Sequence, residues 1–504
     1  MVAIKNNKKV VLFCPRSTLE VRHIGVPLSL LAIGTPLSKE GYDIKIIDGN
    51  IEDDYLDKID SQIKDALCLG ITSMTGPQIK YGLIAANFVK KKYPEVPIIW
   101  GGFHPTILPE QTLFHPAVDI VVRGQGEVTF KELIERLYNK ASLDDVLGIS
   151  YKENGKIITN PERPMMNLNS LPSLNYDLVD IQNYIVKTDY ASRTLDYISS
   201  YGCPYKCSFC AEVFVNKRHW NALTSERVVD DIKNLVKRYN INGIRLADSS
   251  FFIDIERTQK ICEGLIDSGL NIKWGNVNGR PNNLIKYDDE MWGLMKRSGL
   301  SDILIGAESG SQEALDFIDK EAVVEDTIRL KEICSKYNIS LFVSMMIGIP
   351  YRGPVESKKN IKRDLYSILD LINQLQSIDN RHFIAIFIYT PFPGTPMYEL
   401  SLKYGVREPQ SLEEWGQIDM NTTNLPWVSR KYERVVKHLT QFIFLYTTAF
   451  YEKHKQSHFH LIHLIFHYSA LLRMRYRFFA IPIEYSILKL HRKLNKNKNL
   501  LIAS

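Results

Sequence analysis

Residues 8 to 139 alternate between short apolar runs and stretches of helical spacing. Five apolar runs recur in this region, "VVLFC", "IKIID", "CLGIT", "PIIWGG" and "DIVVRG", with helical patterns between and after them. Near-continuous apolar strands separated by helices predict a parallel sheet that helices cover on both faces. The stretch "GISYKENGKIITNP" then alternates and turns at Asn154-Gly155, a dipeptide typical of a two-residue hairpin turn. We therefore predict a doubly wound domain over residues 1–140, followed by a hairpin and linker over residues 141–190.

A second alternation of strand-like and helical patterns runs from Leu195 to Pro393. Its strand-like runs are "LDYISS", "NGIRLAD", "NIKWGNV", "SDILIGA", "SLFVSMMIG" and "FIAIFIYT". Six βα units are too few for a closed eight-stranded barrel, so we predict a partial barrel over residues 191–400. Chemistry in such barrels gathers where strands end. The polar and glycine-rich residues follow the six strands in that way: a cysteine loop, Asp248, Arg280, residues 308–311, residues 348–350 and residues 390–396.

Residues 401–504 have helical patterns that are rich in aromatic side chains and histidine. Seven of the chain's 12 histidines lie between His438 and His491. Residues 456–472 contain no Lys, Arg, Asp or Glu, but four histidines interrupt the stretch, so a membrane-spanning helix is not expected. A buried or interfacial helix fits this pattern better. The predicted fold class is therefore α/β, with a helical C-terminal region.

The positive charge of the chain is concentrated in this C-terminal region. The net charge is +6, and between Arg430 and Lys498 14 basic residues stand against three Glu, a local net charge of +11 that leaves −5 for the rest. Such a region suits a membrane surface or a lipid-like substrate, and it equally suits a helical cap whose charges face water. Nucleic acid is not favoured, because no recognised binding module accompanies the charge.

Seven cysteines divide into two groups. Cys14, Cys68, Cys262 and Cys334 sit singly in apolar patterns, as buried packing thiols do. An odd number without a framework spacing argues against disulfides and favours a reducing compartment. The N-terminus shows no signal-peptide pattern, so we expect a cytoplasmic protein.

The remaining three cysteines are Cys203, Cys207 and Cys210, in one loop with the spacing Cys-x-x-x-Cys-x-x-Cys. Three thiolates in this arrangement can ligate three irons of a 4Fe-4S cluster and leave the fourth iron open for another ligand. The alternative is a zinc ion that a residue such as His219 completes, since structural zinc prefers four protein ligands. Spacing alone leaves both open.

The context of the loop favours the cluster. The loop follows the first strand of the partial barrel, Phe209 precedes its last cysteine, and "GAESGS" ends the fourth strand. This combination resembles the radical S-adenosylmethionine family over about residues 195 to 400. In that family S-adenosylmethionine chelates the open iron of the cluster.

The resemblance implies a role for each matching position. Cys203, Cys207 and Cys210 would hold the cluster and Phe209 would pack near the adenine. Glu308, Ser309 and Gly310 would lie beside the ribose and methionine moieties, and Gly348 would let the backbone approach the adenine. Arg280 is a candidate partner for the carboxylate, because a guanidinium forms bidentate pairs. Asp248 and Arg280 could equally be ion-pair residues at strand ends.

The strand ends of the first domain indicate a second cofactor. They read "IIDGN", "ITSMTG", "WGGFHPT" and "VVRGQGE", without the Gly-x-Gly-x-x-Gly that marks a dinucleotide site. The segments "GGFHPTILPE" and "VVRGQGE" resemble the cobalamin-binding domain that precedes many radical S-adenosylmethionine enzymes. By that resemblance one set of residues would line the slot for the nucleotide tail, namely Ser73, Thr75, Gly101 and Gly102. A second set would face the corrin or its amides, namely His104, Arg123, Gly124 and Glu127.

The domain lacks the Asp-x-His-x-x-Gly loop of the mutase type of cobalamin protein. The only histidine soon after the first strand is His23, with Val21 two residues before it and Val26 three after it. We therefore expect no protein imidazole on the cobalt, from His104 or elsewhere.

Together these features predict a cobalamin-dependent radical methyltransferase acting on an unactivated carbon of a small-molecule or lipid-like substrate. The resemblance also implies an electron donor such as flavodoxin or ferredoxin. The anaerobic magnesium-protoporphyrin monomethyl ester cyclase uses the same cofactors, and the motifs do not separate it. A tRNA methylthiotransferase is not favoured, because that family has three cluster cysteines in its first domain, where this chain has only Cys14 and Cys68, and ends in a small β-barrel. A non-catalytic cobalamin or redox sensor is the alternative from another class.

Overall fold

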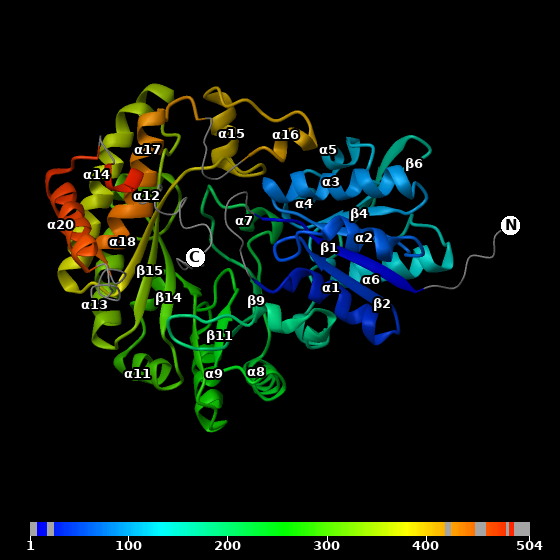
Figure 1. Ribbon diagram of the computed structural model, residues 1–504, viewed down its shortest axis with the longest axis horizontal. Coiled ribbons are helices and arrows are strands. Elements are labelled where there is room, and N and C mark those ends of the chain that lie inside the picture. The colour runs from blue at the N-terminus through cyan, green and yellow to red at the C-terminus, as the bar shows by residue number, and fades with distance from the viewer. Residues whose placement is uncertain (1–7, 18–24, 419–424, 449–459, 480–482, 488–504) are drawn as a thin grey trace.

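The computed structural model describes residues 8–17, 25–418, 425–448, 460–479 and 483–487. Two α/β units lie side by side, the N-terminal unit on the right of Figure 1 and the second unit on the left. The last helices pack on the outer side of the second unit, at the left edge of the same view.

The first unit is built around a seven-stranded sheet of order β2-β1-β3-β4-β5-β6-β7. β1 to β5 are parallel, and β6 and β7 add an antiparallel hairpin at the edge. The strands are β1 (Lys9–Cys14), β2 (Asp43–Asp48), β3 (Leu69–Thr72), β4 (Ile98–Gly101), β5 (Ile120–Val122), β6 (Ile149–Glu153) and β7 (Lys156–Thr159). The helices are α1 (Leu28–Lys39), α2 (Tyr55–Ile63), α3 (Pro77–Lys92), α4 (Phe103–Ile107), α5 (Pro109–Phe114) and α6 (Gly126–Asn139).

The two faces of this sheet form two separate cores. Val11 and Phe13 of β1 belong to one core, and Val10 and Leu12 belong to the other. Side chains alternate between the faces of a strand, so a strand buried on both sides is apolar at every position. The predicted doubly wound domain is confirmed.

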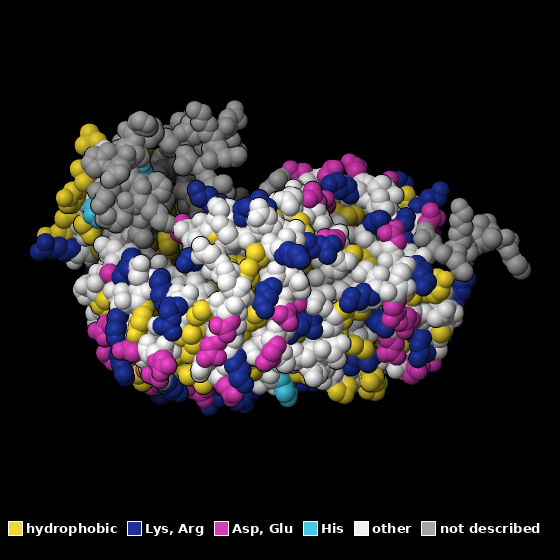
Figure 2. Space-filling view, turned by 90° about the horizontal axis from the view of Figure 1, so that it is seen from below, with side chains coloured by type: hydrophobic (Ala, Val, Ile, Leu, Met, Phe, Trp, Pro, Cys, Tyr) yellow, Lys and Arg dark blue, Asp and Glu magenta, His cyan; other side chains and the backbone are white. Residues whose placement is uncertain are grey.

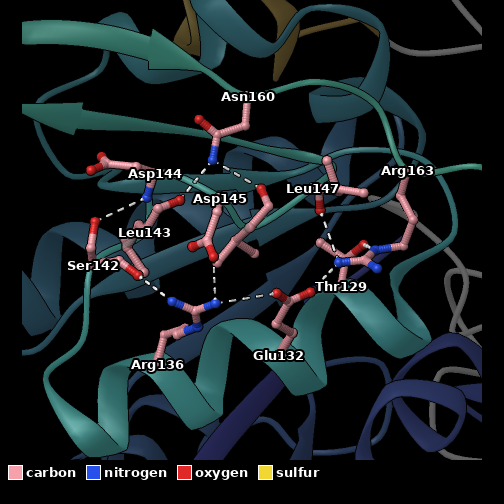
Figure 3. Close-up of polar contacts among 11 residues, drawn as sticks. Thr129, Glu132, Arg136, Ser142, Leu143, Asp144, Asp145, Leu147, Asn160 and Arg163 are labelled. Carbon is pink, nitrogen blue, oxygen red and sulfur yellow. Dashed lines mark hydrogen bonds and ion pairs between the residues drawn. The ribbon is translucent and has the colours of Figure 1, made fainter.

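The hairpin turns where the sequence predicts it. Asn154 and Gly155 have φ values of 50° and 75°, which is the backbone of a type I′ turn. Figure 3 shows how the segments on either side are anchored: the Asn160 side-chain amide donates to the Leu143 carbonyl at 2.7 Å, and the Arg163 guanidinium donates to Thr129 at 2.8 Å. The hairpin is thus an integral edge of the first sheet.

The second unit contains the predicted partial barrel, with six parallel strand positions. One three-stranded sheet has the order β12-β11-β8 and a four-stranded sheet has the order β13-β14-β15-β16. β12 and β13 are one run that Asn276 interrupts with a φ of 51°, so the two sheets share the third position. The strands are β8 (Thr194–Tyr197), β11 (Gly243–Leu246), β12 (Lys273–Gly275), β13 (Val277–Gly279), β14 (Asp302–Glu308), β15 (Ser340–Ile347) and β16 (His382–Ile388). The main outer helices are α8 (Ser225–Tyr239), α9 (Ile255–Asp267), α11 (Asp289–Arg297), α13 (Val324–Lys336) and α14 (Pro354–Ile378).

Direct hydrogen bonds join the first unit to the barrel and to the connector between the units. The Val26 backbone N–H donates to the Asp196 carboxylate at 2.9 Å, and the Tyr184 hydroxyl donates to the Asp48 carboxylate at 3.0 Å. Tyr184 belongs to the connector between the units, which contains three short 3-10 turns over Leu168–Ser170, Tyr176–Leu178 and Ile181–Tyr184. The relative position of the two units is therefore fixed by buried polar contacts.

The C-terminal region is helical, as predicted, and it contacts both units. α15 (Pro396–Lys403) and α16 (Leu412–Trp415) reach the core of the first unit. α17 (Arg430–His438), a π-turn (Leu439–Ile443), α18 (Phe444–Thr447) and α20 (His460–Tyr476) cover the barrel. In the parts of the chain that the structure describes, no helix combines the length and apolar character needed to cross a membrane.

Candidate functional site

The three clustered cysteines lie in a loop between two short antiparallel strands, β9 (Ser200–Gly202) and β10 (Trp220–Ala222). Gly202 has a φ of +84°, and a Cβ at this position would lie 2.0 Å from the His219 carbonyl oxygen, so only glycine fits before Cys203. Cys207 is buried, and Cys203 and Cys210 are half-buried. His219 is exposed.

The three thiols are near enough to influence one another. Burial is the main reason that the pKa of Cys210 is raised to about 12, and the charges of Cys207 and Cys203 raise it further. In the described part of the chain, no three Cys, His, Asp or Glu side chains converge on a position for a single metal ion. The donor set and its loop fit a cluster whose irons each take one thiolate.

The cysteine loop is held from two directions. The Ser208 N–H donates to the Ile318 carbonyl at 3.0 Å, and the Ser208 carbonyl accepts from the Met397 N–H at 3.1 Å. Arg280 is buried beside the loop, with Nη1 3.4 Å from the Cys207 Sγ and its guanidinium 3.6 Å from the centre of the Tyr205 ring. The structure thus brings Arg280 and the three cysteines together.

The other residues assigned from the radical S-adenosylmethionine resemblance lie around the barrel. Glu308 has a φ of 63° and pairs with the almost buried Lys320 at 2.9 Å. Ser309 is buried, and Gly310 lies so close to α14 that a Cβ would be 2.1 Å from the Ser367 carbonyl oxygen. Phe209 packs partly buried against the barrel core.

Asp248 and Gly348 have protein partners that the sequence does not reveal. The fully buried Asp248 carboxylate accepts from the Ser199 N–H at 3.1 Å and from the Ser199 hydroxyl at 2.7 Å, so it fixes the end of the first barrel strand. The Gly348 carbonyl accepts from the Trp427 indole at 2.9 Å, and the Val428 side chain lies 3.1 Å from where a Cβ would be. Gly348 is therefore in contact with the C-terminal region.

A cavity of about 520 Å³ lies between the carboxyl ends of the first sheet and the top of the barrel. Five residues that the cobalamin resemblance assigns line it, namely Ser73, Gly101, Gly102, Gly124 and Glu127. The opposite wall comes from the second unit and includes Asp196, Tyr201, Glu212 and Ser249. Because Glu212 is two residues after Cys210, the cavity adjoins the cysteine loop.

The cavity wall offers buried hydrogen-bonding atoms. The Ser73 hydroxyl, the Gln125 side-chain nitrogen and one oxygen of Glu127 are buried, and they have no hydrogen-bond partner within the described residues. The pKa of Glu127 is raised above its ordinary value, mainly by burial, although its hydrogen bond with Tyr201 acts in the opposite direction. Unpaired buried donors and acceptors are costly in a folded protein, so such atoms are expected to meet a ligand.

The backbone of this wall is shaped by glycine. Gly102 has a φ of 99°, and a Cβ there would lie 2.6 Å from the Ser73 carbonyl oxygen, so the position admits only glycine. The bare backbone at Gly101 and Gly102 and the polar atoms around it fit a large group that carries amides. The residues present thus fit cobalamin.

Thr75, His104 and Arg123 lie outside the cavity lining. The buried His104 ring has Nδ1 3.0 Å from the Thr75 hydroxyl and its centre 5.2 Å from the Trp415 ring. Burial lowers the pKa of His104 from 6.5 to about 3, so the ring is neutral. The Arg123 guanidinium donates to the Ile149 carbonyl at 3.1 Å and to the Asn160 carbonyl, and so it holds the hairpin.

Sequence reasoning missed the contribution of the C-terminal region to the first unit. Trp415 is fully buried, its indole donates to Gln111, and the Gln111 side-chain nitrogen donates to the Pro409 carbonyl at 3.1 Å. Glu413 lies 3.2 Å from His115. We call residues 396–418 the clamp, because the same segment holds Ser208 through Met397.

Comparisons with known proteins match one family to each of the two α/β units. Residues 18–134 match the family model of the B12 binding domain, and residues 197–356 match that of the radical SAM superfamily. An uncharacterized methyltransferase of Pyrococcus horikoshii is 30% identical, over 82% of this chain and 87% of that protein. The anaerobic magnesium-protoporphyrin IX monomethyl ester cyclase of Rubrivivax gelatinosus is 27% identical over 59% of this chain and 53% of that protein.

Among solved structures, the fold is similar to that of the radical S-adenosylmethionine methyltransferase TsrM from Kitasatospora setae, whose structure contains cobalamin and a [4Fe-4S] cluster. The TM-score is 0.62 at 17% identity, over 78% of this chain and 74% of that chain. This similarity extends across both α/β units, so the arrangement of the two units belongs to the shared fold.

Proposed function

Because the chain belongs to the cobalamin-binding radical S-adenosylmethionine enzymes, we propose that it methylates an unactivated carbon of a small molecule in the cavity between its two α/β units. Its cofactors as a member of this family are a 4Fe-4S cluster, S-adenosylmethionine and cobalamin. When bound, the cluster and S-adenosylmethionine supply radical chemistry and cobalamin supplies the methyl group.

The observation that carries this proposal is the position of the cavity. Its first wall carries the cobalamin-type residues, including Ser73 and Gly102, and its second wall includes Glu212, which adjoins the cysteine loop. A methyl donor and a source of radicals must reach the same carbon atom of the substrate. A single cavity at the junction satisfies this requirement, because it holds the reacting groups in one place.

On the barrel side, we assign Cys203, Cys207 and Cys210 as ligands of the cluster. The contacts of Ser208 with Ile318 and Met397 hold the loop in shape before any cluster enters. Arg280 places a positive charge beside the Cys207 sulfur, and positive charge stabilises the thiolate that binds metal. The Glu308–Lys320 pair and Gly310 form the neighbouring surface for S-adenosylmethionine in this assignment.

On the sheet side, we assign the hydrogen bonds to cobalamin to Ser73, Gln125 and Glu127, each of which has one buried side-chain atom without a hydrogen-bond partner among the described residues. Gly101, Gly102 and Gly124 leave the backbone accessible in this assignment. His104 supports the wall from behind through Thr75, and its neutral, buried ring has no place on the cobalt.

We place the enzyme in the cytoplasm, where a flavodoxin or ferredoxin can deliver single electrons. The seven cysteines are all free thiols in the structure, which suits a reducing compartment.

The test uses the reconstituted enzyme with cobalamin, a strong reductant, S-adenosylmethionine labelled with deuterium in its methyl group, and a metabolite and lipid extract of the source organism. Methylation transfers the labelled methyl group into a product that mass spectrometry detects, and it releases 5′-deoxyadenosine. A product that takes its new atom from labelled water instead would support a cyclase-type oxygen insertion. Turnover of S-adenosylmethionine that stays absent with every extract would support a cobalamin or redox sensor.

A further inference from the structure

The C-terminal helix α20 exposes a continuous apolar row to solvent. Leu461, Ile465, Tyr468, Leu472 and Tyr476 follow one another at intervals of four, three, four and four residues. Their exposed fractions are 67%, 57%, 59%, 54% and 69%. Residues at these intervals share one face of a helix, so they form a single row along most of α20.

The opposite face of α20 is apolar as well. Phe466, Ala470 and Met474 are buried in the barrel core at 6%, 0% and 5% exposure. A helix that only covered a soluble domain would carry polar residues on its outer face. α20 therefore does more than cap the barrel.

The exposed apolar side chains of the protein are concentrated at this place. Half of the large hydrophobic residues that are exposed in the described structure, nine of 18, lie between Leu461 and Ile487. The same helix borders a surface groove of about 690 Å³ whose walls include Leu464, Tyr468, Leu472 and Phe478. Contiguous apolar patches of this kind mark interaction sites, whereas isolated exposed hydrophobic residues do not.

The apolar row belongs to a strongly basic part of the sequence. Residues 430–498 carry a net charge of +11, and Arg475 is exposed near the C-terminal end of the helix. Figure 2 shows apolar side chains along the left edge of the molecule, the side on which α20 lies in Figure 1, with basic side chains at the lower end of this band. Two copies of so basic a region would repel each other, whereas an anionic surface attracts it at about 1 kcal/mol for each Lys or Arg near the surface.

We propose that this face, the row from Leu461 to Tyr476 with Phe478, docks on the surface of a membrane that contains anionic lipid. Apolar residues and tyrosines of the row enter the headgroup region while the exposed Arg475 meets lipid phosphates. This is the binding mode of interfacial helices that lie in the plane of the bilayer. It is independent of the reaction in the cavity, because vesicle binding needs neither cofactor nor substrate.

The test is co-sedimentation of the full-length protein with phosphatidylcholine vesicles, with and without phosphatidylglycerol. The wild type is expected to sediment with the anionic vesicles at low salt and to be released as salt rises. The variant Ile465→Glu with Leu472→Glu is expected to bind the anionic vesicles at least about tenfold more weakly than the wild type, because two charged groups replace apolar groups that enter the bilayer. The matched control, Ile255→Glu with Ile266→Glu on α9, makes the same charge change at two exposed apolar positions and is expected to bind as the wild type does.

Three results would overturn the proposal. The first is a wild-type protein that stays in the supernatant with anionic vesicles at low salt. The second is equal loss of binding in the α9 control, which would mean that net charge alone drives attraction. The third is a dimer, detected by light scattering, that the α20 variant abolishes, which would assign the face to a second copy of the chain. Unfolding curves and the cofactor spectra of each variant show that it is folded.

Discussion

Replacing Trp415 by alanine is expected to weaken cobalamin binding while the iron–sulfur cluster remains. Trp415 belongs to the clamp and is fully buried against the first unit, with His104, Tyr398 and Gln111 around its ring. Behind it, His104 contacts Thr75, and the His104 N–H donates to the Ser73 carbonyl at 3.3 Å. Ser73 lines the cavity, so the indole supports the sheet-side wall of the cavity from outside.

The size of the effect follows from burial. Truncating a fully buried tryptophan to alanine costs about 3–5 kcal/mol, and leaving the Gln111 oxygen without its donor belongs to that cost. Most of this loss is expected in the docking of the clamp on the first unit. If about 1.4 kcal/mol of this loss appears in the free energy of cobalamin binding, through displacement of Ser73, the dissociation constant of cobalamin rises about tenfold.

The assay is equilibrium binding of aquocobalamin to the apo-protein, with cluster absorbance and denaturant unfolding measured on the same samples. The control is Trp292→Ala, since Trp292 is equally buried but lies in the barrel core beside Tyr287 and Tyr337. It should lose similar stability and keep its cobalamin affinity. Trp415→Ala with reduced stability and unchanged affinity would show that the clamp has no influence on the cavity.

Three further outcomes are expected. Cys203→Ala, Cys207→Ala and Cys210→Ala should each abolish the cluster absorbance, whereas Cys68→Ala, at a buried site in the first unit, should keep it; the reverse pattern would contradict the assignment. Burial lowers the pKa of His104 from 6.5 to about 3, so the neutral ring stabilises the fold fully above pH 6.5, and this stability is lost as the pH falls toward 3. His104→Gln should therefore flatten the pH dependence of the free energy of unfolding in this window by up to about 1.4 kcal/mol per pH unit. An unchanged slope would contradict the burial argument. Nitrogen hyperfine lines from a protein ligand are not expected in the paramagnetic resonance of bound Co(II), and lines that disappear in His104→Gln would refute this.

The parts of the fold that depend on local pattern could be predicted from the sequence. The central strands of the first sheet are buried on both faces, so their apolar runs are unambiguous, and the Asn154-Gly155 turn needs only its own two residues. The cysteine spacing likewise identifies its loop without knowledge of the rest of the molecule.

The contacts that complete the site depend on tertiary structure. Strand ends locate loops, but they do not give the direction of each side chain: after Gly102 the chain enters α4, and His104 meets Trp415, 311 positions later in the sequence, away from the cavity. The structure also places Val428 and the Trp427 indole against Gly348, contacts that the sequence does not indicate. The periodicity of a sequence does not predict contacts of this kind, because they depend on where segments distant in the sequence meet in space.

The cavity depends on the junction as much as on either unit. Glu127 of the first unit forms a hydrogen bond with Tyr201 of the second unit. The Val26 N–H of the first unit donates to the Asp196 carboxylate of the barrel at 2.9 Å. A ligand that binds both walls stabilises this arrangement of the two units by a free energy that grows with the logarithm of its affinity. Changes at the clamp or at these joints should therefore alter cofactor retention before they alter any group at the reacting carbon.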